Sequence, residues 1–131
     1  MNDFICPHCH AYLNVCNYIT FSAEKEDGTK GLILLHPELG NFDSDHHSRF
    51  PTEEGEMITF RCPACHISLT SGKSNKLACI QAVDNDEKKF DIYFSRIKGE
   101  KSTYKVEGET VELYGDHTDN YINYFNLSQV K

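Results

Sequence analysis

Four cysteines, arranged as two pairs, carry the clearest chemical signal in the sequence. Cys6 and Cys9 form the first pair, Cys62 and Cys65 form the second, and each pair encloses a proline and one further residue. Two thiolates at this spacing on a tight turn can both point at one ion, and a second pair completes a tetrahedron with Zn–S distances of about 2.3 Å. Four thiolates leave no coordination position open to water. We therefore predict one structural, non-catalytic zinc ion per chain.

The two pairs belong to a repeated pattern. Residues 4–13 and 60–69 both read F-x-C-P-x-C-H-x-x-L. These motifs resemble the two knuckles of zinc-ribbon proteins, and the resemblance covers the knuckles and their flanking strands only. It implies a zinc ribbon built on two strand–turn–strand units. Because 52 residues (positions 10–61) separate the pairs, against about 15–20 in short zinc motifs, a hairpin and a long loop are expected as insertions.

Two other metal cofactors fit parts of the pattern. Each motif reads C-x-x-C-H, the attachment sequence for c-type haem, but haem attachment requires export, and no export signal is visible. The two C-P-x-C turns also resemble rubredoxin, and tetrahedral thiolate sites accept zinc or iron. Rubredoxin knuckles usually place glycine after the second cysteine, whereas this chain has His10 and His66 there. Zinc is therefore preferred, with a rubredoxin-like iron electron carrier as the alternative.

The segment from position 36 to 47 is a second candidate site. His36, Asp43, Asp45, His46 and His47 offer imidazoles and carboxylates within one loop. They could build a second metal site or an acid–base pair, and hence an enzyme. A hydrophilic loop without a site is preferred, because no regular element is predicted that would aim these side chains at one point.

The sequence indicates no catalytic residues outside that loop. No G-x-S-x-G nucleophile motif occurs, and the S-G-K-S at positions 71–74 lacks the upstream glycine of a phosphate-binding loop, since Ile67 stands there. Cys16 and Cys79 lie in strand-like stretches without basic neighbours, so we predict small buried apolar side chains and not reactive thiols. A non-enzymatic role is favoured.

The elements that position the cysteines are predicted to be strands, so the fold class is mainly β. One domain is expected over residues 1–131, with a zinc-ribbon half at 1–72 and an antiparallel β-meander at 73–131. A short terminal helix would begin near Asp116, with Tyr121, Ile122, Tyr124 and Phe125 packing down. The predicted strands occupy residues 14–22, 31–36, 56–61, 77–83, 89–97 and 102–114, and a long loop occupies residues 36–55.

Charge and hydropathy restrict the possible partners. The formal net charge is −7, so binding to the nucleic-acid backbone is not expected, although lysines and one arginine gather between positions 73 and 105. The longest apolar run, residues 32–35, is far too short for a membrane span. The N-terminus shows no secretory pattern, so a cytoplasmic location is expected, where thiols stay free or bind metal.

These observations favour a small, zinc-stabilised cytoplasmic binding or adaptor protein. Its partner is expected to be a protein, and two surfaces are candidates for the contact. The first is the acidic loop at residues 36–55, and the second is the basic turn region at residues 96–105. The sequence leaves the oligomeric state open.

Overall fold

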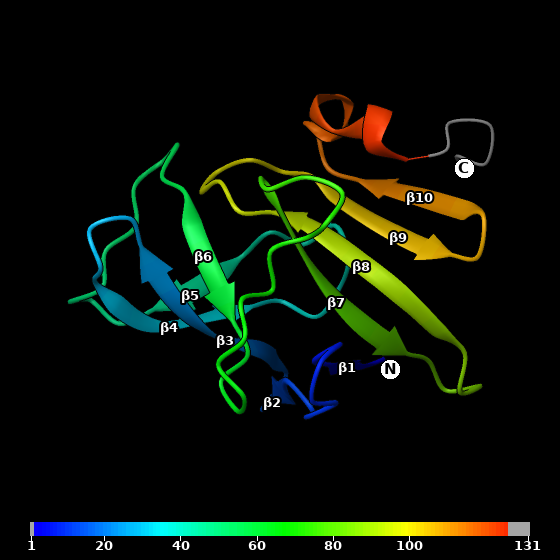
Figure 1. Cartoon of the computed structure of the whole chain (residues 1–131), viewed down its shortest axis with the longest axis horizontal. Coiled ribbons are helices and arrows are strands. Elements are labelled where there is room, and N and C mark those ends of the chain that lie inside the picture. Colours follow the sequence, from blue (N-terminus) through cyan, green and yellow to red (C-terminus); the bar gives the residue numbers. More distant parts are fainter. Residues whose placement is uncertain (1, 126–131) are drawn as a thin grey trace.

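Antiparallel strands make up most of the ordered structure. The computed structural model describes residues 2–125, and in that range ten strands and two short 3-10 turns are found. The strands form two five-stranded sheets that face one another (Figure 1). The mainly β fold class predicted from the sequence is therefore confirmed.

The first sheet, sheet A, contains the predicted C-terminal meander. Its strand order is β1-β7-β8-β9-β10, and every pairing is antiparallel. The meander occupies four adjacent positions, and β1 from the N-terminal half pairs with β7 at the edge. The two halves expected from the sequence thus share one sheet. The strands are β1 (Asp3–Ile5), β7 (Leu77–Val83), β8 (Lys89–Ser95), β9 (Thr103–Glu107) and β10 (Thr110–Tyr114).

The second sheet, sheet B, is built around the longest strand of the chain. Its order is β2-β3-β4-β5, and β6 pairs with residues 22–25 of β3. The strands are β2 (Asn14–Val15), β3 (Tyr18–Lys25), β4 (Lys30–Leu35), β5 (Ser44–His46) and β6 (Ile58–Arg61). Strand β5 lies within the stretch predicted to be a loop. The prediction missed it because its residues are polar and its pairing with β4 uses backbone groups alone.

A cluster of three phenylalanines joins the two sheets. Phe21 of β3, Phe60 of β6 and Phe94 of β8 pack with ring centroids 5.1–5.5 Å apart. Two of the three pairs meet edge to face, an arrangement that the quadrupole of the rings favours. Phe21 has no exposed surface. The main core of the protein therefore lies between sheet A and sheet B.

Backbone hydrogen bonds connect the sheets a second time. The Ile58 N–H donates to the carbonyl of Arg96 at 2.9 Å, and the Lys98 N–H donates to the carbonyl of Glu56 at 2.9 Å. The Arg96 side chain donates to the carbonyl of Ile58 and to the hydroxyl of Thr59, both at 2.9 Å. This basic side chain is thus held by β6, and the start of β6 is fixed to the turn that follows β8.

The C-terminal segment follows β10 (Figure 1), and its Tyr121 and Phe125 pack against Tyr93 and Tyr104 on the outer face of sheet A. It forms two 3-10 turns, η1 (Thr118–Asn120) and η2 (Ile122–Tyr124). Tyr121 and Phe125 are buried as predicted, whereas Tyr124 is half exposed. Neither turn has a side-chain cap and each contains three residues, so the predicted helix is realised only as 3-10 turns. No helix within residues 2–125 has the length or the apolar character to cross a membrane.

This covering segment explains why β8 is buried on both faces. Tyr93 alternates with Phe90, Ile92 and Phe94 along the strand, so its side chain lies on the opposite face of the sheet. Its ring packs edge to face against Phe125, with centroids 5.2 Å apart, and Tyr93 is only 9% exposed. The outer face of sheet A therefore carries a second, smaller core.

Candidate metal centre

The first cysteine pair lies on a tight turn directly after β1. The His10 N–H donates to the carbonyl of Cys6 at 2.9 Å, and the Cys6 N–H donates to the carbonyl of Ala11 at 3.0 Å. These two hydrogen bonds close the turn. His10 has a φ of 64°, a left-handed conformation that non-glycine residues seldom adopt. The backbone thus turns sharply enough for both thiols to face the same point.

The second pair lies on a turn with the same hydrogen bonds, directly after β6. The His66 N–H donates to the carbonyl of Cys62 at 2.9 Å, and the Cys62 N–H donates to the carbonyl of Ile67 at 3.1 Å. The φ of His66 is 67°. The sequence repeat therefore corresponds to a repeated local structure, and a histidine takes the left-handed conformation in each turn.

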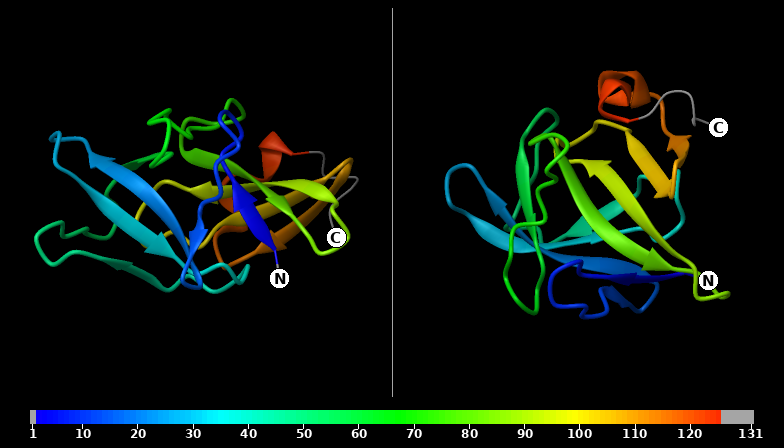
Figure 2. Two further views of the ribbon diagram at one scale, coloured as in Figure 1. Left: turned by 90° about the horizontal axis from the view of Figure 1, so that it is seen from below. Right: turned by 45° about the vertical axis from the view of Figure 1, so that its right-hand side comes forward.

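The two turns lie side by side and bring the four sulfurs together (Figure 2). The Sγ atoms of Cys6 and Cys65 are 3.8 Å apart, and those of Cys9 and Cys62 are 3.7 Å apart. All four sulfurs lie within 4.8 Å of one another. A tetrahedron with Zn–S bonds of about 2.3 Å has S–S edges of about 3.8 Å. The predicted ligand atoms are thus within metal-binding distance.

Backbone N–H groups support the two innermost sulfurs. The Cys6 sulfur accepts from the N–H groups of His8 and Cys9, both at 3.4 Å. The Cys62 sulfur accepts from the N–H groups of Ala64 and Cys65 at 3.3 and 3.5 Å. Such bonds offset negative charge on a thiolate and orient it toward the metal. Cys6 and Cys62 are fully buried, whereas Cys9 is exposed, so the centre lies at the surface with its inner half enclosed.

The pKa directions of the thiols show what a cation contributes here. Burial raises the pKa of Cys6, against the N–H groups that lower it. At Cys62 burial also raises the pKa, but the N–H groups of Cys65 and Ala64 and the neighbouring thiols outweigh it, so the net pKa is lowered. At Cys65 the N–H of Ile67 lowers the pKa, but desolvation and the other thiols raise it to about 12. Burial and the neighbouring thiols therefore oppose ionisation of Cys6 and Cys65, and a divalent cation would stabilise the thiolates together.

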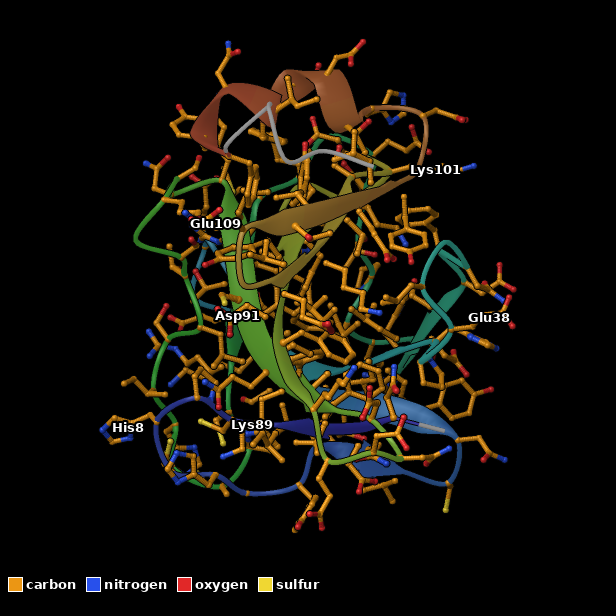
Figure 3. The ribbon with its side chains drawn as sticks, turned by 90° about the vertical axis from the view of Figure 1, so that its right-hand side faces the viewer. His8, Glu38, Lys89, Asp91, Lys101 and Glu109 are labelled. Carbon is orange, nitrogen blue, oxygen red and sulfur yellow. The ribbon has the colours of Figure 1, made fainter. Side chains whose placement is uncertain are left out.

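The knuckle histidines do not reach the sulfurs. His8, His10 and His66 are exposed, and none of their rings forms a hydrogen bond with a cysteine in the described part of the chain. His8 extends from the edge of the molecule, opposite Glu38 (Figure 3). The N–H groups that contact sulfur belong to the backbone instead.

The histidines and aspartates of residues 36–47 do not gather into a metal site. The His36 ring accepts from the Glu38 N–H at 3.0 Å, and the His47 ring accepts from the Arg49 N–H at 2.9 Å. Within residues 2–125, the four cysteines are the one group of three or more ligand side chains close enough to share an ion. The imidazole nitrogens of His36 and His47 stabilise local turns instead.

The two remaining cysteines differ from one another. Cys16 is exposed and lies with Asn17 in the two-residue turn between β2 and β3, where their φ angles are 50° and 68°. The prediction that Cys16 is buried in a strand was therefore wrong. Cys79 lies on β7 and is partly buried, and burial raises the pKa of its thiol to about 12. Its thiol is therefore protonated and unreactive at neutral pH.

Sequence reasoning missed a cleft between the two sheets, with a volume of about 240 Å³. One wall comes from residues 36–44, which belong to the predicted acidic loop, and another comes from residues 95–103. Its inner surface consists of core side chains such as Ile33, Leu35 and Phe94. The two segments singled out by charge thus border the same cleft. No local pattern reveals this, because the segments meet only through the tertiary fold.

Comparisons with protein-family models, with curated proteins and with solved structures find no match to this chain. The four-cysteine cluster is therefore the feature that links the protein to a known kind of site. Zinc and iron both accept four thiolates in a tetrahedron. The S–S distances fit either ion.

Proposed function

We propose that this is a small zinc-stabilised binding protein, whose zinc ion is structural and is held by knuckles of the zinc-ribbon type. The observation that carries the proposal is the approach of four sulfurs, two from each knuckle, to the edge length of a tetrahedral thiolate site. Four thiolates close the coordination sphere, so the ion has no position at which to activate water or polarise a substrate. Its role is to stabilise the fold.

The position of the knuckles explains what the ion stabilises. The first knuckle continues from β1 in sheet A, and the second continues from β6 in sheet B. An ion bound by both knuckles therefore links the two sheets. This link lies at the end of β6, whereas the backbone bonds of residues 56–58 to residues 96–98 lie at its start. The two connections together fix β6 against sheet A.

Zinc is preferred to iron as the resident ion, and metal analysis of the purified protein decides between them. We expect about one zinc per chain and no visible absorption, because zinc has a filled d shell. Replacement by cobalt should give the intense visible bands of a tetrahedral thiolate site. One iron per chain with a coloured ferric form would instead support the rubredoxin-like electron carrier. A protein that binds neither metal would refute the proposal.

A binding role completes the proposal, and the cleft supports it. The acidic loop and the basic turn, each expected to contact a partner, border one concave surface. Concave, mainly apolar surfaces with a few polar groups are the usual form of binding sites. The cytoplasmic location and the protein partner expected from the sequence belong to this proposal. Pull-down with the intact protein and with a Lys98→Glu variant at the cleft would test whether a partner depends on this surface.

A further inference from the structure

We propose that the four-cysteine centre is a redox switch, in which peroxide joins Cys9 to Cys62 by a disulfide and the ion is released while the two sheets stay linked. This inference rests on the proposed function, because it concerns the regulation of the same four cysteines. Three observations lead to it: one exposed cysteine among the four, sulfur contacts that cross from one knuckle to the other, and a connection between the sheets that does not involve the ion.

The four cysteines differ in their access to solvent. Cys6 and Cys62 have no exposed surface, whereas Cys65 is partly buried and Cys9 is exposed. Metal binding requires the sulfurs to be thiolates, and oxidation by peroxide is fastest at thiolates that solvent can reach. A small oxidant dissolved in water therefore meets Cys9 first.

The sulfur contacts in the centre run between the knuckles. Cys9 Sγ lies 3.7 Å from Cys62 Sγ, and Cys6 Sγ lies 3.8 Å from Cys65 Sγ. An S–S bond is about 2.05 Å long, so the first pair has to approach by about 1.7 Å to form one. Cys62 is thus placed to react with an oxidised Cys9, although its own sulfur is buried.

The reaction balances with one molecule of hydrogen peroxide. The Cys9 thiolate attacks one peroxide oxygen and the O–O bond breaks, which yields a sulfenic acid on Cys9 and one hydroxide ion. The Cys62 thiolate then attacks the Cys9 sulfur, the S–S bond forms, the S–O bond breaks, and a second hydroxide ion leaves. The two sulfurs together lose two electrons, which the two peroxide oxygens gain. Two of the four ligands are lost, so the centre no longer holds the ion tightly.

The sheets remain connected without the ion. The first knuckle follows β1 of sheet A and the second follows β6 of sheet B, so a disulfide between Cys9 and Cys62 joins the same two sheets. Backbone hydrogen bonds between residues 56–58 and 96–98 hold the start of β6 and involve no cysteine. Thiol reductants reverse such a disulfide. Oxidation therefore changes the knuckles and preserves the rest of the fold.

Peptide mapping after treatment with hydrogen peroxide tests the inference. A Cys16→Ser/Cys79→Ala double variant retains only the four ligand cysteines, so every disulfide within the chain has to lie in the metal centre. Trypsin releases residues 1–25 and 62–73 as separate peptides, and each contains one knuckle pair. A disulfide between knuckles joins the two peptides, whereas a disulfide within a knuckle leaves them apart. The mass of the intact protein excludes dimers, and fragmentation of the joined peptides identifies the bonded cysteines.

The expected result is a coupled loss of thiols and metal. One equivalent of peroxide should lower the free thiols of the zinc-loaded double variant from four to two per chain and release about one zinc to a chromogenic chelator. The oxidised protein should melt about 10–20 °C above the reduced protein stripped of metal, because the disulfide closes the loop that the ion closed. Dithiothreitol and zinc should restore both thiols and bound metal.

The wild type provides a control for exposure alone. Cys16 is exposed like Cys9 but lies outside the cluster, so no second sulfur is at hand to complete a disulfide. At one equivalent of peroxide, Cys9 and Cys62 should be consumed while Cys16 stays a free thiol. The same peptide map measures this in the wild type, and it also replaces the double variant if that variant does not fold.

The outcomes separate this inference from the proposed function. A bond between Cys9 and Cys62 that forms with loss of zinc would support the inference. Bonds confined within the knuckles, a bond between Cys6 and Cys65 that forms first, or the absence of any disulfide would overturn it. Retention of zinc after oxidation, or oxidation of Cys16 before Cys9, would overturn it as well. Metal content before oxidation tests the zinc proposal separately, and in a protein without metal the peptide map would still decide which sulfurs pair.

Discussion

Replacing one exposed ligand of the metal centre, Cys9→Ser, should remove the ion and destabilise the fold. Cys9 has little packing to lose, because it is exposed. A loss of stability in this variant therefore reports on the metal and not on the core. Cys16→Ser provides a matched control, because Cys16 is also exposed but lies at a hairpin turn away from the cluster.

The size of the effect follows from the loop that the ion closes. The residues that meet across the site, Cys9 and Cys62, are 53 positions apart. Closing a loop of that length reduces the entropy of the unfolded chain by an amount worth about 4 kcal/mol at 25 °C. This is a large part of the roughly 5–15 kcal/mol that stabilises an ordinary domain. The backbone link between residues 56–58 and 96–98 remains, so we expect a weakened fold and not a complete loss of structure.

Urea and thermal denaturation followed by circular dichroism, with metal analysis of the same samples, measure this effect. Cys9→Ser should contain less than half an equivalent of zinc and should melt roughly 10–20 °C lower than the wild type. Cys16→Ser should stay within about 0.5 kcal/mol of the wild type. Treating the wild type with a strong chelator should lower its stability to that of Cys9→Ser.

Two results would refute this reasoning. If Cys9→Ser lost the ion but kept the stability of the wild type, the metal would not link the sheets energetically. If Cys16→Ser lost as much stability as Cys9→Ser, the effect would come from serine at exposed turns and not from ligation. The chelator experiment distinguishes these cases, because it changes no side chain.

Three further changes test the packing of the fold. Phe21→Ala should cost about 3–5 kcal/mol in urea denaturation, because the side chain is fully buried between the sheets, whereas Leu32→Ala on the exposed face should stay within about 0.5 kcal/mol. Burial raises the pKa of Tyr104 to about 12, so the folded protein keeps the hydroxyl proton to a higher pH than the unfolded chain does. The free energy of unfolding should therefore fall as pH rises from about 10 to 12. This fall with pH should be shallower in Tyr104→Phe, and an equally steep fall would contradict the assignment. Gly115→Ala should lower the melting temperature more than Gly28→Ala. Both glycines have a positive φ, but of the two only Gly115 would bring a Cβ atom against backbone, at the carbonyl of Lys101. Equal losses would show that this contact is unimportant.

The elements with a strong local pattern could be predicted from the sequence. The predicted strand at residues 77–83 matches β7 to the residue, because a short, mainly apolar run is bounded by polar residues on both sides. The clustering of the four cysteines could be predicted as well, because two thiols in a C-x-x-C pair need only a tight turn to face one point. In both cases the determining interactions are local or are encoded in residue type.

The features that the sequence did not reveal depend on non-local contacts. The pairing of β1 with β7 joins Phe4 to Ala82, and no pattern in three residues specifies a partner so distant. Nothing in the sequence of β8 indicates that Phe125 of the C-terminal segment covers Tyr93. Cys16 was placed in a strand because its neighbours are strand formers. The structure instead uses Cys16 and Asn17 as a turn in which both residues have positive φ.

The position of β1 has a consequence for how the chain is made. The first three-residue strand has its hydrogen-bonding partner in residues 81–83, so it cannot pair until those residues have left the ribosome. At about 5–20 residues per second this takes several seconds, during which the thiols of the first knuckle precede those of the second. The nascent chain therefore needs a reducing environment until both halves of its metal site exist. Expression in an oxidising compartment should divert these early thiols into disulfides before the ion can bind.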